Sequence, residues 1–199
     1  GSGNDRGATA DDVWLGYAGS TPGNHRAVFK WDVSSISTSA IVTAATMSLK
    51  WKFDAYGGGE TDTIRAYRIT NQSMDESVTW STYDGSNAWT TAGSDYTTTN
   101  GASFAWSKGQ DVTFTGEDFV ALVQDAITNR GGFLSIVCAT DSELGATFSG
   151  NDFMKLHSSN AADSANYPSL SITYTPVTHW TGGAEDGNLD TAGNWSGGA

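Results

Sequence analysis

The sequence has a single cysteine and no long apolar run. The one cysteine, Cys138, excludes an intramolecular disulfide framework and a zinc site built from several thiolates. It ends the apolar run 133–138, so we predict a buried structural thiol rather than a reactive nucleophile. No run approaches the roughly 18 apolar residues that span a bilayer. We therefore expect no membrane insertion.

Charged residues are also scarce, and those of positive sign most of all. They make up 16% of the chain, and 10 Lys and Arg face 22 Asp and Glu, for a net charge of −12. A surface of this sign repels the phosphate backbone of DNA and RNA. Nucleic acid is therefore excluded as an expected partner.

The motifs of common catalytic sites are missing. The three histidines, His25, His157 and His179, do not form a His-Glu-x-x-His pattern, and neither a phosphate-binding Gly-x-x-x-x-Gly-Lys loop nor a Gly-x-Ser-x-Gly elbow occurs. Adjacent carboxylates such as Asp75-Glu76 are typical of solvated or capping acids, since glycosidase carboxylates must face each other across a cleft. We predict that the chain is not an enzyme and needs no cofactor.

What the sequence does have is glycine, aromatic rings and strand periodicity. With 24 glycines and 8 tryptophans among 199 residues, it is typical of a folded, β-rich domain. From Ala45 to Phe53 every second residue is apolar, which predicts one strand with Met47, Leu49, Trp51 and Phe53 on a buried face. Further strands are predicted at 12–17, 27–32, 63–70, 112–115, 132–139, 146–157 and 169–175. The predicted fold is all-β, a jelly-roll-like antiparallel β-sandwich.

One segment has the period of a helix instead. Phe119, Leu122, Val123, Ala126 and Ile127 form an apolar stripe, which predicts one short amphipathic helix at about 117–129. Thr115 and Asp118 resemble a capping box at its start, and Gly131-Gly132 predict positive φ angles just after its end.

The polar segment from Trp80 to Phe104 is predicted to be a long loop. Four rings in or near it, Trp80, Tyr83, Trp89 and Trp106, lie in polar sequence, whereas Trp31 and Trp51 fall on the apolar phase of strands. An exposed ring on a rigid scaffold can stack on a sugar or anchor a protein contact, although such rings also fold inward. The four are therefore candidates for glycan or partner binding.

Acidic loop residues offer a further alternative. Asp84 and Asn87, with Asp141 and Glu143, carry the oxygen ligands that Ca²⁺ prefers, but neither segment has the spacing of an EF-hand. Solvated acids are the alternative interpretation.

Pro176 marks a change of character, and three regions are predicted: an N-terminal segment 1–11, a β-sandwich 12–176, and a Gly- and Trp-rich segment 177–199. The last is either a connector or the start of a further β module. Because glycine-rich segments order poorly by themselves, we expect Trp180 and Trp195 to anchor it on another chain or domain.

The order of short motifs over residues 12–175 resembles the DNRLRE domain family, which overlaps alginate-type carbohydrate-binding modules. The matching segments are Leu15-Gly16-Tyr17, Arg26 to Ile36, Ile41 to Leu49, Tyr67 to Thr70, Glu76 to Trp80, Asp111-Val112-Thr113, Leu122-Val123-Gln124, Gly131 to Leu134 and Pro168 to Tyr174. The resemblance implies a jelly-roll module, usually non-catalytic, on secreted, cell-surface or virion proteins. One departure is Asn160, which follows Ser158-Ser159 where the family often has Glu.

Two functions from different classes follow. The first is a structural or adhesive surface module, such as a bacteriophage capsid-decoration, head-fibre or tail protein, that contacts identical or related subunits and also binds glycan. The alternative is a carbohydrate-binding module of a larger secreted bacterial protein that acts on polysaccharide. The family resemblance favours glycan, while the acidic, lysine-poor composition and the segment after Pro176 favour assembly. In both cases the expected location is extracellular, at the cell surface or on a virion.

Overall fold

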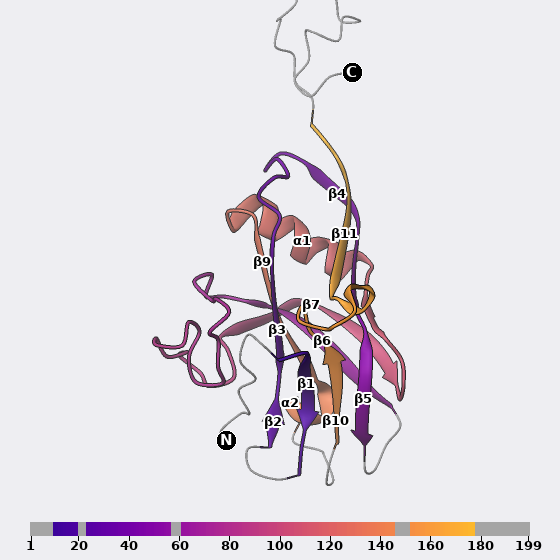
Figure 1. The fold of residues 1–199 in the computed structure, drawn as a ribbon. Helices are drawn as coiled ribbons and strands as arrows, with labels where there is room; N and C mark the ends of the chain where they lie inside the picture. The colour runs from indigo at the N-terminus through magenta and orange to yellow at the C-terminus, as the bar shows by residue number, and fades with distance from the viewer. Residues whose placement is uncertain (1–9, 20–22, 57–60, 146–151, 178–199) are drawn as a thin grey trace, which may run out of the picture.

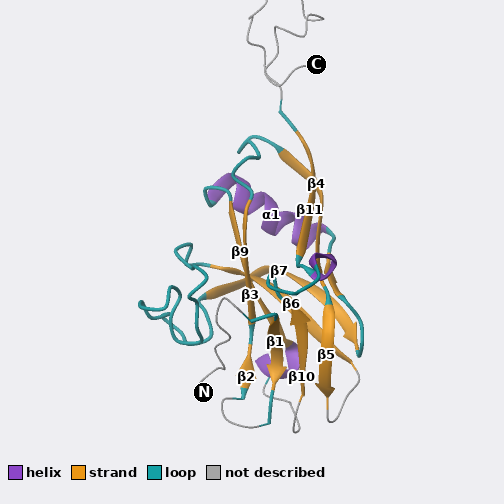
Figure 2. Ribbon diagram, in the orientation of Figure 1, coloured by secondary structure: helices purple, strands orange, loops and turns teal. Residues whose placement is uncertain are grey.

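The computed structural model describes residues 10–19, 23–56, 61–145 and 152–177, which form antiparallel sheets and two short helices (Figures 1 and 2). The strands are β1 (Asp12–Tyr17), β2 (Asn24–His25), β3 (Ala27–Asp32), β4 (Ile41–Leu49), β5 (Trp51–Tyr56), β6 (Thr61–Ile69), β7 (Tyr96–Ser107), β8 (Val112–Phe114), β9 (Phe133–Thr140), β10 (Asp152–His157) and β11 (Ser169–Thr175). The helices are α1 (Glu117–Asn129) and α2 (Asp141–Leu144), with a 3-10 turn at Ser164–Asn166. The prediction of a mostly β chain is confirmed. In the described part of the chain no helix is long and apolar enough to cross a membrane.

The strands form three sheets, in the orders β2-β1-β10-β5, β11-β4-β8 and β3-β9-β6-β7. Every named pair is antiparallel. One core cluster draws buried residues from all three sheets and from α1. The three sheets and α1 therefore share one main core.

The strand predicted from Ala45 to Phe53 is two strands in different sheets. β4 ends at Leu49 beside β8, and β5 begins at Trp51 beside β10. Asp111 explains the break, because its carboxylate accepts the Trp51 N–H at 2.8 Å and pairs with Lys50 Nζ at 2.7 Å. Met47 and Leu49 are fully buried as predicted, but Phe53 is 48% exposed, so the prediction of one buried face is wrong beyond the break.

Helix α1 begins and ends where the sequence predicts, and the five residues of its predicted apolar stripe are all buried. The capping box is wrong: the N-cap is Gly116 at φ 85°, with no hydrogen bond from a capping side chain. The expected positive φ values of Gly131 and Gly132 are confirmed, at 63° and 80°. At Gly132 a Cβ would lie 2.3 Å from the Ser34 Cα, so no larger residue fits there.

The loop predicted from Trp80 to Phe104 is wrong in its second half, where β7 begins at Tyr96. This 12-residue strand pairs with β6 and is the longest one described. Its polar start, Thr97 to Thr99, lacks the alternation that predicts a strand. Gly101 packs against Tyr67, whose ring lies 2.3 Å from where a Cβ would be.

Cys138 lies in the core and is fully buried, as predicted. Burial raises the pKa of its thiol, which keeps it protonated at neutral pH. Its neighbour Val137 points to the opposite face of the sheet, where it packs with Ile69, Met74 and Trp89 in a second, smaller cluster. The segment between β6 and β7 thus covers the outer face of the sheet β3-β9-β6-β7.

Candidate functional site

Two of the four candidate rings are buried. Trp106 is 1% exposed on β7, within the main core, and its Nε1 donates to the Gln110 carbonyl at 2.9 Å. Trp89 is 6% exposed in the smaller cluster, and its Nε1 donates to the Thr79 carbonyl at 3.0 Å. The interpretation of these two as exposed rings is therefore wrong. Trp106 belongs to a strand of the core, and the polar loop that carries Trp89 packs on the outer face of a sheet.

The other two candidates are half-buried. Tyr83 meets Trp89 edge-on, with ring centroids 5.7 Å apart, and so supports the loop. Trp80 lies beside the Arg26 guanidinium, which is 5.3 Å from the centre of its ring. Trp80 and Trp89 line a groove in the described part of the chain, whereas Tyr83 and Trp106 do not.

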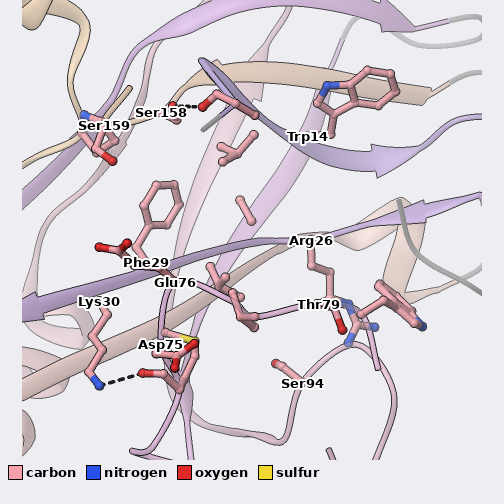
Figure 3. Close-up of a pocket in the computed structure, with 18 of the residues that line it drawn as sticks. Trp14, Arg26, Phe29, Lys30, Asp75, Glu76, Thr79, Ser94, Ser158 and Ser159 are labelled. Carbon is pink, nitrogen blue, oxygen red and sulfur yellow. Dashed lines mark hydrogen bonds between the residues drawn. The ribbon is translucent and has the colours of Figure 1, made fainter. Parts of the chain in front are cut away.

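This groove, which we call the β3 groove, has a volume of about 670 Å³ and runs along β3. Figure 3 shows Trp14, Ser158 and Ser159 on one side of the strand, and Lys30, Asp75 and Ser94 on the other. One wall thus comes from β1 and the turn after β10, and the other from the segment between β6 and β7.

β3 is an edge strand, and its open edge faces this groove. β9 is its only partner strand in the described part of the chain. Val33 continues the register opposite Gly132 and donates to its carbonyl at 2.7 Å. Since antiparallel pairs alternate between bonded and unbonded, the N–H and C=O groups of Val28, Lys30 and Asp32 point away from β9. The groove therefore contains a row of backbone donors and acceptors.

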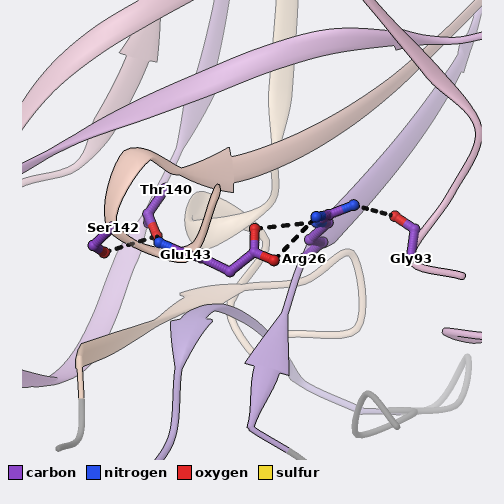
Figure 4. A network of polar contacts seen from close by, with 5 residues as sticks. All are labelled: Arg26, Gly93, Thr140, Ser142 and Glu143. Atoms are coloured by element: carbon purple, nitrogen blue, oxygen red, sulfur yellow. Dashed lines mark hydrogen bonds and ion pairs between the residues drawn. The ribbon is translucent and has the colours of Figure 1, made fainter. Parts of the chain in front are cut away.

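A buried ion pair fixes one end of the groove (Figure 4). The Arg26 guanidinium donates to both Glu143 oxygens, at 3.1 and 3.0 Å, and to the Gly93 carbonyl at 2.9 Å. The Glu143 side chain is 1% exposed, and its backbone N–H donates to the Thr140 hydroxyl at the start of α2. The pair thereby ties α2 and the 93–94 turn to the start of β3.

Ser94 carries the one positive φ angle of a non-glycine residue in the described ranges, at 90°. Ser94 is only 3% exposed, and its Oγ has no hydrogen-bond partner among the described residues. A left-handed conformation costs a non-glycine residue about 1–2 kcal/mol, and such outliers gather at binding sites. A buried hydroxyl without a partner costs about 1–3 kcal/mol more, which a ligand hydroxyl or a water can recover.

Acidic side chains dominate the rim. Asp75 and Glu76 are exposed on one wall, and hydrogen bonds from the Ser34 side chain and backbone N–H lower the pKa of Asp32. Lys30 is held by the carbonyls of Gln72 and Met74, at 3.0 and 2.7 Å. Because the charge of Arg26 is balanced by Glu143, the groove is negative on balance.

Trp14 is a groove residue that sequence reasoning missed. Its ring stacks on Phe153 at 4.8 Å, Lys155 Nζ lies 4.3 Å from the ring centre, and its Nε1 donates to Asp12 at 3.0 Å. The sequence did carry a signal: Trp14 precedes Leu15 in a predicted strand, so if Leu15 is buried, Trp14 points to the opposite face of the sheet. Trp31 is a second aromatic residue of the groove that was not among the candidates. It lines the groove and is half-buried against the core.

The four calcium candidates are engaged elsewhere. Asp84 accepts the backbone N–H groups of Ser86 and Asn87, at 3.0 and 2.6 Å, which lowers its pKa. Asp141 pairs with Arg65 at 2.7 Å, and Glu143 pairs with Arg26. In the ranges described, no three or more His, Cys, Asp or Glu side chains come together as a metal site.

Trp180 and Trp195 lie outside the described residues. No known protein-family model matches the chain. A comparison with curated proteins finds no match either.

Proposed function

We propose that this chain is a non-catalytic surface module that binds a glycan chain in the β3 groove. The observation that carries the proposal is that the strained, buried Ser94, with an unpartnered hydroxyl, lines the same groove as the half-buried rings of Trp14 and Trp80. Ring faces and hydroxyl-bonding groups are the two things that a sugar ring needs from a protein.

Each part of the groove has a task in this proposal. Indole rings stack on the apolar face of a pyranose, because they offer a large area and lose little side-chain entropy. The Ser94 hydroxyl and the outward backbone groups of Val28 and Lys30 bond sugar hydroxyls. A strand edge is straight, so the groove suits an extended chain better than a compact ligand.

The charge of the groove selects the glycan class. Asp32, Asp75 and Glu76 line the groove of a protein whose net charge is −12, and this negative surface repels a polyuronate such as alginate. We therefore propose that the ligand is an uncharged glycan.

The family proposal is consistent with this placement. The antiparallel sheets support a DNRLRE-like module with jelly-roll topology, on a secreted, cell-surface or virion protein. Ser158, Ser159 and Asn160, where the family often has Ser-Ser-Glu, line the β3 groove. An amide in place of that carboxylate agrees with an uncharged ligand.

The test is binding of uncharged and anionic oligosaccharides by titration calorimetry. Wild-type protein should bind members of a set of β-glucan, xylan, mannan and chitin oligomers more tightly than alginate oligomers. Trp80→Ala should weaken that binding by about 1–3 kcal/mol, the value of one stacked ring on a nucleic-acid base. Phe53→Ala removes an exposed ring outside the groove and serves as the matched control.

Both variants are compared with wild type by thermal unfolding, so that a misfolded Trp80 variant is recognised. If no oligosaccharide binds, or if Phe53→Ala causes the same loss as Trp80→Ala, the proposal is contradicted.

A further inference from the structure

The sheet β11-β4-β8 contains no charged residue. Its strands read SLSITYT, IVTAATMSL and VTF, in a chain that carries 22 acidic and 10 basic residues. The other two sheets both contain acidic and basic side chains within their strands. This sheet is therefore the surface on which two copies of a protein of net charge −12 repel each other least.

One edge of this sheet is open. In the described part of the chain β11 pairs with β4 alone, and Figure 1 shows the two strands side by side near the top of the molecule. The register shift that this pair contains places the extra residue, Thr43, on β4, so the backbone of β11 continues without a bulge. Apart from the backbone bonds to β4, one hydrogen bond to β11 is described: the Thr43 Oγ1 donates to the Thr173 carbonyl at 3.2 Å.

Natural edge strands usually carry a lysine, a proline or a bulge that prevents pairing with another chain. Residues 169–175 carry none of these on the strand itself. Alternate residues along the strand thus present unpaired backbone N–H and C=O groups to solvent.

The inward side chains of β11 are also incompletely covered. Leu170 and Ile172 pack against the core but are only half-buried, whereas Met47 and Leu49 on the neighbouring strand are fully buried. Near the end of the strand, Tyr174 is 42% exposed, although Val42, its partner across the ladder, is only 6% exposed. A further strand beside β11 would complete the burial of these side chains.

We propose that β11 pairs with β11 of a second copy of this chain, antiparallel and across a two-fold axis. A second copy fits because an uncharged strand is complementary to itself, and a two-fold axis closes the contact into a dimer. With the axis at Ile172, the centre of the strand, Ser171 faces Thr173 of the second copy and Thr173 faces its Ser171. The dimer joins β11-β4-β8 to its own copy as one continuous sheet, and it does not depend on a ligand in the β3 groove.

Two double variants at the same positions test this register. Ser171 and Thr173 are exposed, so replacing them does not disturb the core. S171K/T173K places two like-charged pairs across the axis, whereas S171E/T173K places two opposite-charged pairs there. The Glu–Lys variant is therefore a matched control for the Lys–Lys variant.

The measurement is sedimentation equilibrium of the full chain over a range of concentrations. Wild type and S171E/T173K should dimerise reversibly, and S171K/T173K should have a dissociation constant higher by about tenfold or more. Hydrogen exchange in 169–175 should become slower as the dimer forms. Circular dichroism confirms that each variant is folded.

Three results would overturn the proposal. Wild-type protein that stays monomeric at all concentrations would show that the edge does not pair with itself. An S171K/T173K variant that dimerises as wild type does would place the contact elsewhere. Equal loss in both double variants would contradict the register centred on Ile172.

Discussion

The β3 groove and the β11 edge both contain an open strand edge, but charged side chains lie along the first and not along the second. Along the groove, Arg26 and Lys30 each bind a partner on another segment, and Asp32 accepts the nearby backbone N–H of Ser34. Along β11 there is no charge at all. The difference shows that an open edge alone does not define a function, and that the side chains around it select the class of ligand.

In the groove, charges are fixed before any ligand arrives. The Arg26–Glu143 pair fixes the 93–94 turn, and Lys30 is held by two carbonyls of the next segment. Such a wall suits a polar ligand of defined shape. The β11 edge offers only backbone groups and uncharged side chains, which suits a strand of another protein chain.

The largest effect should come from breaking the buried ion pair. Arg26→Met leaves the Glu143 carboxylate buried without its guanidinium, which should lower the free energy of unfolding by about 3–5 kcal/mol. Arg65→Met breaks the Arg65–Asp141 pair, whose side chains are 35% and 42% exposed, and should cost less than about 1 kcal/mol. Urea denaturation of both variants measures the difference.

Equal destabilisation in these two variants would show that burial of the Arg26–Glu143 pair does not matter for stability. Glycan binding should also be weaker in Arg26→Met under conditions in which it remains folded, because the turn that carries Ser94 loses its anchor.

The next largest effect is the loss of stability when a leucine of the sheet β11-β4-β8 is replaced by alanine, and it should differ between two positions. Leu49 is fully buried on β4, so Leu49→Ala should cost about 2–5 kcal/mol. Leu170 on the open edge is half-buried, and Leu170→Ala should cost about 1 kcal/mol in the monomer. A cost at Leu170 as large as that at Leu49, measured at low concentration, would mean that β11 is covered in the monomer.

A smaller effect is expected at Ser94, and it should separate stability from binding. Ser94→Gly removes the Cβ from a position at φ 90° and should stabilise the fold by about 1 kcal/mol. The same change removes the buried hydroxyl, so it should weaken glycan binding. The melting temperature and calorimetric titration report the two effects; a variant that loses stability, or binds as wild type does, would contradict the role of Ser94.

The smallest effect is that of salt on the dimer. Copies of net charge −12 repel each other at long range, while the proposed seam contains no ion pair. Raising sodium chloride from low to physiological ionic strength should therefore tighten the dimer by about two- to threefold. Dimers that weaken with salt would indicate that ion pairs hold the interface.

Local sequence patterns predicted the helices and strands better than they predicted how the strands pair into sheets. The helix 117–129 and the strand 27–32 follow from periodicity alone, because their buried faces repeat at the expected spacing. Periodicity did not show that the chain changes sheet after Leu49, since the cause is Asp111, a residue far away in the sequence.

The site was predictable only in part for the same reason. Polar sequence around Trp80 and Trp89 correctly identifies the segment that forms one wall of the groove, but not which ring is buried. The Arg26–Glu143 pair joins residues that are 117 positions apart, and the strain at Ser94 depends on the turn that this pair anchors. Long-range contacts of this kind leave no local signal.

The most direct test of the proposed glycan site uses the tryptophans as reporters. The indole N–H signals are followed by ¹H–¹⁵N correlation spectra during titration with the tightest-binding uncharged oligosaccharide, and assigned by single Trp→Phe variants. The β3 groove predicts that the Trp14 and Trp80 signals shift with a common dissociation constant while that of the core residue Trp106 does not move. Shifts confined to rings outside the groove, or no shift at saturating oligosaccharide, would contradict the account.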